Sequence, residues 1–132
     1  MTETPTRFTP KPDTLRELFL KSGNFCAVPN CTALMMNEAG VFIGQVCHIE
    51  AAEPGGERFN PAMTNEQRRA YSNLMLMCYP HHRVTNDVVQ YPVERLQQIK
   101  WIFRSLMTEI ARARPLRAPG YCACPTGQPR TL

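Results

Sequence analysis

Hydrophobic residues recur at helical spacing close to the start of the chain. Leu15, Leu18 and Phe19 fall on one face of a helix, because residues three and four positions apart lie on the same side. Asp13 stands where a helix N-cap is expected, and Gly23 stands where glycine commonly ends a helix. We therefore predict a helix that begins at Asp13 and stops at Gly23.

A second and longer helical pattern begins at Pro92 and runs to Arg114. Proline suits the first turn of a helix, where its missing N–H is not needed. The apolar positions of this predicted helix are Leu96, Ile99, Ile102, Phe103, Leu106 and Ile110.

Between the two helical patterns, short β-rich segments alternate with breaks. Residues 40–52 are rich in β-formers and predict a strand or hairpin arm that ends near His48. Residues 64–72 open with the Thr-x-x-Gln spacing of a capping box, which predicts a short helix. Residues 74–77 predict a short buried strand, and residues 81–87 a brief helix or turn.

The length of 132 residues fits one domain, which we expect over residues 13–114. Residues 1–12 contain three prolines and predict a flexible arm, and residues 115–132 predict a disordered tail. The sequence has no apolar run of membrane-spanning length and no signal-peptide pattern, so we expect a cytoplasmic protein. In that compartment six cysteines indicate metal binding or free thiols before disulfides.

The formal net charge is +4, and the basic residues are concentrated towards the end of the chain. After position 94 a single acid, Glu109, stands against Arg95, Lys100, Arg104, Arg112, Arg114, Arg117 and Arg130. A basic surface suits an anionic partner such as nucleic acid. From charge alone, however, a solvated helix face is the better interpretation.

Two pairs of metal-ligand residues lie far apart in the sequence. Cys26 and Cys31 bracket a Pro-Asn turn, and Cys78 and His81 follow the predicted strand 74–77. Structural zinc sites are commonly assembled from two such pairs of thiolate and imidazole ligands. The spacing predicts a structural zinc, and the alternative is that Cys26 and Cys31 are ordinary buried thiols.

His82, next to His81, needs a separate explanation. Adjacent residues on a helical turn point about 100° apart, so both imidazoles do not face one ion comfortably. Asn86 shares the face of His82 if the segment is helical. His48 closes a β-rich segment beside a Gly-Gly loop and is a third candidate.

The segments "SGNFCAVPNC", "VCHIEAAEPGG", "NLMLMC" and "HHRVTND", in this order, resemble the HNH endonuclease family of the ββα-metal (His-Me finger) fold. The resemblance covers residues 22–87 and is greatest to HNH modules of bacterial and phage proteins, including anti-phage defence effectors. It implies an α+β fold, in which a small ββα-metal core with a zinc site is flanked by an N-terminal helix and a long C-terminal helix.

The resemblance also implies a role for each candidate residue in hydrolysing phosphodiester bonds. His48 would be the general base, and Asn73 would orient His48 or shape the metal site. His82 would hold one catalytic ion, Mg²⁺ or Mn²⁺, with Asn86 as a weaker second ligand. Cys47 departs from the family pattern, which commonly has Asp or His there, and we expect it to be a core residue.

The implied partner is DNA, with the duplex as the expected form, bound mainly through its phosphates. The candidate phosphate-binding residues are Arg58, Arg69 and Arg83, whereas Arg68 is expected to be a solubilising charge. Two alternatives remain, which are a catalytically inactive zinc-stabilised nucleic-acid-binding module and an adaptor. The adaptor would use Trp101 and Phe103 on the final helix as a partner face, in a homodimer or a larger defence complex. No role is evident for Cys122 and Cys124.

Overall fold

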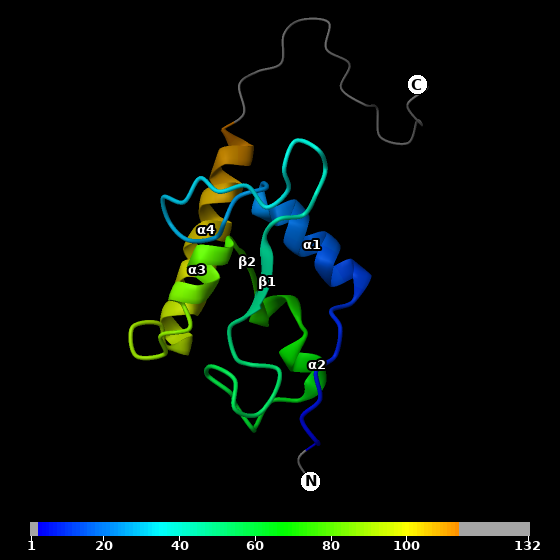
Figure 1. Cartoon of the computed structure of the whole chain (residues 1–132). Helices are drawn as coiled ribbons and strands as arrows, with labels where there is room; N and C mark the ends of the chain where they lie inside the picture. The colour runs from blue at the N-terminus through cyan, green and yellow to red at the C-terminus, as the bar shows by residue number, and fades with distance from the viewer. Residues whose placement is uncertain (1–2, 114–132) are drawn as a thin grey trace, which may run out of the picture.

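The structure is a computed structural model that describes residues 3–113. Helices dominate it, and two short strands lie at its centre (Figure 1). In chain order the elements are α1 (Pro12–Ser22), β1 (Gln45–His48), α2 (Asn65–Arg68), the 3-10 turn η1 (Tyr71–Asn73), β2 (Leu74–Met77), α3 (Tyr79–Val84) and α4 (Val93–Arg112). This is a small α+β fold, as the sequence predicted.

Helix α1 begins one residue earlier than expected. Pro12 occupies the first turn and Lys11 is the N-cap, without a side-chain capping hydrogen bond. The prediction that Asp13 caps the helix is therefore wrong, because the fixed φ of Pro12 already suits the first helical position. Gly23 ends the helix with a left-handed φ of 58°, as predicted.

Strands β1 and β2 form an antiparallel pair in which His48 is opposite Leu74. All four residues of β2 are buried, which explains why its sequence is continuously apolar rather than alternating. The predicted strand over 40–52 ends at His48 as expected but begins only at Gln45. The residues before Gln45 instead contact the 35–36 segment, since Phe42 pairs with Met36 and Ile43 N–H donates to the Met35 carbonyl.

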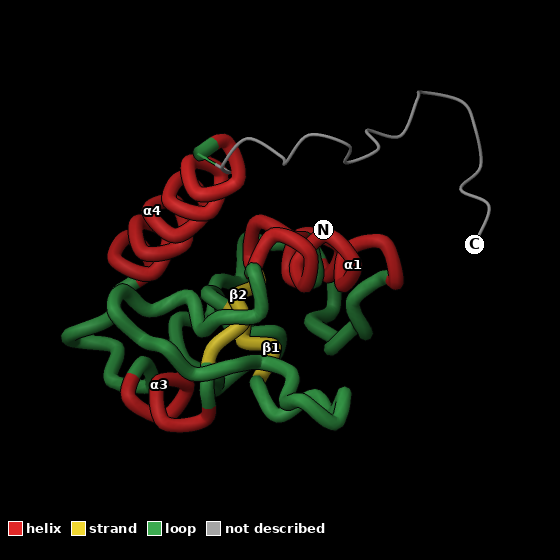
Figure 2. Tube along the Cα trace, turned by 90° about the horizontal axis from the view of Figure 1, so that it is seen from above, coloured by secondary structure: helices red, strands yellow, loops and turns green. Residues whose placement is uncertain are grey.

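The two strands lie between helices. Helices α1 and α4 cover one side of the pair, and α3 lies on the other (Figures 1 and 2). One core cluster joins α1 and the strands to the 26–35 segment and consists of Leu18, Cys26, Met35, Cys47, Leu74, Leu76 and Met77. A second cluster joins α4 to the strands and consists of Ala27, Ile49, Met75, Leu96 and Ile99.

Helix α4 is fixed to the strands by a basic residue as well as by apolar contacts. Lys100 turns inward and donates to the carbonyls of Tyr71 and Leu74. Burial lowers the pKa of the Lys100 ammonium to about 8. The basic residues of the C-terminal third are therefore not all part of a solvated face.

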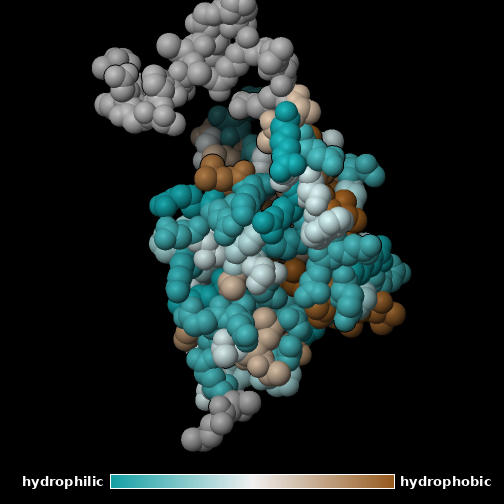
Figure 3. Space-filling model, turned by 180° about the vertical axis from the view of Figure 1, so that it is seen from behind, coloured by the Kyte–Doolittle hydropathy of each residue, from teal (hydrophilic) through white to brown (hydrophobic). Residues whose placement is uncertain are grey.

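The predicted partner face of α4 is divided between surface and core. Trp101 is 68% exposed, whereas Phe103 packs against the second core cluster. Seen from behind, the molecule is largely hydrophilic, with hydrophobic residues in small separate areas (Figure 3). Within residues 3–113, each helix is too short or too polar to cross a membrane.

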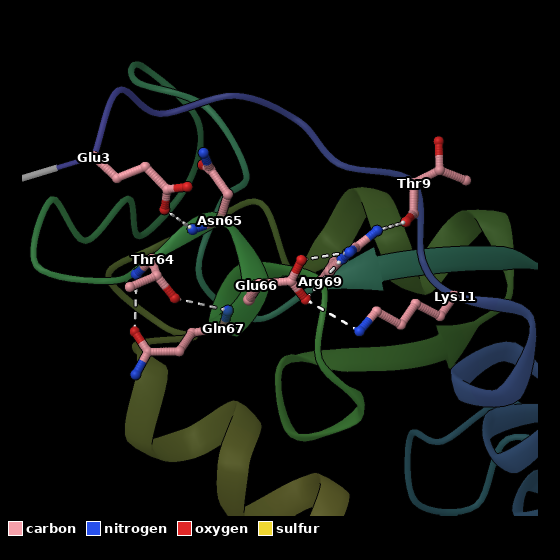
Figure 4. A network of polar contacts seen from close by, with 8 residues as sticks. All are labelled: Glu3, Thr9, Lys11, Thr64, Asn65, Glu66, Gln67 and Arg69. Atoms are coloured by element: carbon pink, nitrogen blue, oxygen red, sulfur yellow. Dashed lines mark hydrogen bonds and ion pairs between the residues drawn. The ribbon is translucent and has the colours of Figure 1, made fainter.

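Residues 3–11 have no regular secondary structure but lie along α2. The predicted capping box of α2 is confirmed, since Thr64 and Gln67 exchange hydrogen bonds between side chain and backbone (Figure 4). Glu3, Thr6 and Thr9 are hydrogen-bonded to Asn65 and Arg69 in the structure, and flexibility of the arm 1–12 in solution stays a prediction. The predicted tail 115–132, with Cys122 and Cys124, lies outside the described residues.

Candidate functional site

The four predicted zinc ligands lie together in the structure. The zinc cluster consists of Cys26, Cys31, Cys78 and His81, whose ligand atoms are all within 4.8 Å of one another. Cys31 Sγ is 3.9 Å from Cys78 Sγ, and Cys26 Sγ is 3.5 Å from His81 Nδ1. A tetrahedral ion with zinc–sulfur bonds of about 2.3 Å places two sulfurs about 3.8 Å apart, so the cluster could hold a zinc ion.

Local sequence explains how the first pair of ligands is presented. Cys31 N–H donates to the Val28 carbonyl at 3.1 Å and closes a four-residue turn. Pro29 and Asn30 are its central residues, and Asn30 has the positive φ of 66° that asparagine tolerates. The turn returns Cys31 towards Cys26, as the Pro-Asn pair predicted.

The second pair stands at the start of α3. Cys78 is the N-cap residue, and its carbonyl accepts from His82 N–H at 2.9 Å. His81 lies in the first helical turn and places Nδ1 3.1 Å from Cys78 Sγ. Strand β2 and helix α3 thus deliver both ligands without an intervening loop.

The thiols of the cluster are free cysteines rather than a disulfide. The 3.9 Å between Cys31 and Cys78 sulfurs is far above the roughly 2.05 Å of an S–S bond. Burial raises the pKa of the Cys26 thiol to about 12. A thiolate at that buried position therefore needs a nearby cation to stabilise it, and a zinc ion would supply that positive charge.

A cleft of about 470 Å³ is lined mainly by β1 and by residues of the 51–58 segment. Three of the predicted active-site residues, His48, His82 and Asn86, line it from the end of β1 and from α3 with the residues after it. Cys47 also borders the cleft but is 3% exposed and belongs to the first core cluster, as expected. Burial raises the pKa of its thiol to about 12.

Within residues 3–113, His48 has an unpaired buried nitrogen. Its Nε2 is buried and has no hydrogen-bond partner among the described residues. Buried polar atoms are nearly always paired, and an exception in a native structure often marks a functional site. Burial lowers the pKa of the imidazole, and the positive charge of Arg7 lowers it further.

Asn73 acts on the backbone beside His48 and not on its ring. Its Oδ1 accepts from Glu50 N–H at 2.9 Å, and its Nδ2 donates to the carbonyls of Glu50 and Arg68. These contacts fix the turn that follows His48, so the Asn73 amide acts on His48 through the backbone.

The predicted phosphate-binding arginines differ in what they already contact. Arg58 donates through Nε to the Ile49 carbonyl and through Nη1 to two further carbonyls, so its guanidinium serves the fold. Arg69 is paired with Glu66 and donates to the Thr9 carbonyl. Arg83 is exposed.

Arg68 corrects an expectation, because it is 1% exposed and not a solubilising charge. Its guanidinium stacks on Phe59 at 5.0 Å and donates to Asn65 Oδ1 and to the Asn60 carbonyl.

The protein ligands for a catalytic ion are few. Within residues 3–113, the zinc cluster is the one group of three or more His, Cys, Asp or Glu side chains placed to share an ion. In the cleft, His82 offers an imidazole nitrogen and Asn86 an amide oxygen. Mg²⁺ prefers a shell of oxygens, so this pair alone does not form a magnesium site.

Sequence reasoning missed Arg7, which also lines the cleft. Proline-rich sequence around it carries no apolar periodicity, so nothing in the pattern of residues 3–11 indicates contact with the rest of the domain.

Comparison of the chain with protein-family models and with curated proteins finds no match in either set.

Proposed function

We propose that the protein is an HNH-type endonuclease that hydrolyses DNA phosphodiester bonds with the help of a divalent ion. The observation that carries this proposal is the meeting of His48 and His82 in one cleft. They come from an antiparallel strand pair and the helix that directly follows it, which is the order of elements expected of a ββα-metal nuclease. The resemblance of residues 22–87 to that family points the same way.

His48 is the proposed general base. Because its Nε2 is buried, we assign the attacking water to Nδ1, which requires the tautomer with the hydrogen on Nε2. A lowered pKa keeps the ring neutral, and therefore able to accept a proton, at neutral pH. Asn73 is a positioning residue, since it fixes the backbone turn after His48.

His82 and Asn86 are the proposed protein ligands of the catalytic ion. Bound there, a divalent cation would neutralise negative charge that develops on the phosphate. With one imidazole in the set, Mn²⁺ fits better than Mg²⁺, because imidazole suits softer ions. Phosphate and water oxygens would have to complete the coordination shell.

The zinc cluster supports this arrangement through α3. His81 belongs to the cluster and His82 to the cleft. A zinc ion held by Cys26, Cys31, Cys78 and His81 would fix the start of α3 and with it the position of His82. The structural ion is thus proposed to orient the catalytic one.

The test is cleavage of supercoiled plasmid by the purified, zinc-loaded protein with added Mn²⁺ or Mg²⁺. We expect cleavage that requires the added ion and that falls by about 10²-fold or more in His48→Ala. The variant, purified in parallel, also controls for contaminating nuclease. Equal cleavage by both preparations would refute the proposed mechanism.

The second candidate is a zinc-stabilised DNA-binding module without catalytic activity. The small number of protein ligands in the cleft favours it, since His82 and Asn86 are two where several are usual. DNA binding without ion-dependent cleavage in the same assay would select this alternative.

A further inference from the structure

The N-terminal arm is fixed on both sides of Arg7. On one side, Thr6 N–H donates to Asn65 Oδ1 at 2.8 Å, and Asn65 N–H donates to Glu3 Oε2 at 2.7 Å. On the other side, Arg69 Nη1 donates to the Thr9 carbonyl at 3.0 Å (Figure 4). Arg7 is thereby held at one place on the molecule although its own segment has no regular structure.

That place is the mouth of the His48 cleft. Arg7 lines the cleft together with His48, and its charge acts on the imidazole. The guanidinium has one ion-pair partner in the described residues, Glu53, at 3.6 Å, and both side chains are 57% exposed. An exposed pair of this kind contributes little, so a better anion can replace Glu53.

The cleft needs such a cation if it is to accept DNA. The other charged and titratable groups that line it with His48 are Arg7, Cys47, Glu53, Glu57, Arg58 and His82. Two carboxylates oppose a polyanion, and the Arg58 guanidinium is occupied by backbone carbonyls. Arg7 is therefore the cleft-lining arginine, within residues 3–113, whose guanidinium is available to an incoming anion.

We propose that Arg7 binds a backbone phosphate of the DNA strand in the cleft, and that this phosphate displaces Glu53. The inference rests on the proposed function, which identifies the bound polymer as DNA. The Arg7 contact makes the N-terminal arm part of the binding site. Arginine suits this contact because its planar guanidinium can donate two parallel hydrogen bonds to a phosphate.

The experiment compares Arg7→Gln with the control Arg16→Gln. Arg16 is an exposed arginine on α1 that pairs with Asp13. Binding of a short duplex is measured at several salt concentrations in the His48→Ala background, so that the DNA is not cut. We expect Arg7→Gln to weaken binding and to reduce the slope of log affinity against log salt by about 1, as loss of one phosphate contact should. Arg16→Gln should leave affinity and slope unchanged.

A second measurement follows the His48 imidazole by NMR titration with the wild-type residue at position 48. Loss of the Arg7 charge, which also leaves Glu53 unpaired, should raise the pKa of His48. A wild-type salt slope in Arg7→Gln overturns the inference, even if that pKa moves. A reduced slope, together with no plasmid cleavage by the protein that keeps His48, would instead support the Arg7 contact and refute the nuclease.

Discussion

At the scale of single residues, His48 combines a buried, unpaired nitrogen with a position at the edge of a cleft. Leaving a buried polar atom unpaired costs free energy, about 1–3 kcal/mol in typical cases. The Asn73 hydrogen bonds hold the backbone of Glu50 in the turn after His48 and leave the His48 nitrogen unpaired within the described residues. Burial also lowers the pKa of the imidazole, which suits the neutral ring that the proposed general base requires.

The pH dependence of cleavage should report this environment. A general base is active when neutral, so kcat/KM falls as pH drops through the pKa of the free enzyme's base. Because burial lowers the pKa of His48, the midpoint of that fall should lie below the ordinary value of 6.5. The measurement is kcat/KM from pH 5 to 8, with zinc content checked at each pH. A midpoint at or above 6.5 with zinc retained would argue against His48 as the base.

Residue identity predicted which side chains form the zinc cluster better than it predicted what the arginine side chains contact. Cysteine and histidine spacing located the zinc cluster, because those side chains have few other reasons to recur in pairs. Arginine side chains occur both in buried structural contacts and on the protein surface. Arg58 and Arg68 satisfy carbonyls inside the domain, and Arg7 reaches the cleft through contacts with α2 that no local pattern encodes.

At the scale of elements, α3 is the component that joins the two candidate sites. It has six residues, with Cys78 at its N-cap and His81 in its first turn. His82, the next residue, faces the cleft. One short helix therefore contributes His81 to the zinc cluster and His82 to the cleft.

Single substitutions in α3 should separate these two sides. His81→Ala removes a zinc ligand, so we expect loss of zinc and a lower melting temperature. His82→Ala should keep zinc and melting temperature near wild type but require more divalent ion for less cleavage. Zinc content, thermal unfolding and ion-dependent cleavage are measured for both variants. Indistinguishable behaviour would contradict the division of the two histidines between sites.

Elements with local causes were predictable from sequence. Strand β2, the capping box of α2 and the start of α4 near Pro92 each follow from a few adjacent residues. Features with distant causes were not. Residues 41–44 contact the 35–36 segment instead of extending β1, and the arm packs along α2, because both depend on partners elsewhere in the chain.

At the scale of the whole molecule, the four residues of the zinc cluster come from segments that are distant in sequence, so a zinc ion held there would join them. Cys26 and Cys31 precede the strand pair, whereas Cys78 and His81 follow it. The first core cluster surrounds the same place and is small. A domain of this size has about 5–15 kcal/mol of stability, which is comparable to the roughly 10–16 kcal/mol of apparent zinc binding in finger peptides. The ion should therefore decide whether the domain is folded.

Two buried cysteines allow a matched test of this conclusion. Cys26 and Cys47 are 1% and 3% exposed, and both belong to the first core cluster, but Cys26 alone of the two belongs to the zinc cluster. Cys26→Ala should lose zinc and unfold most of the domain at room temperature. Cys47→Ala should keep one zinc per chain and lose only about 1 kcal/mol, the typical cost of a small core substitution. Zinc per chain and circular dichroism during thermal unfolding measure both effects. If Cys26→Ala stays folded without zinc, or if both variants lose the same stability, packing rather than the ion holds these segments together.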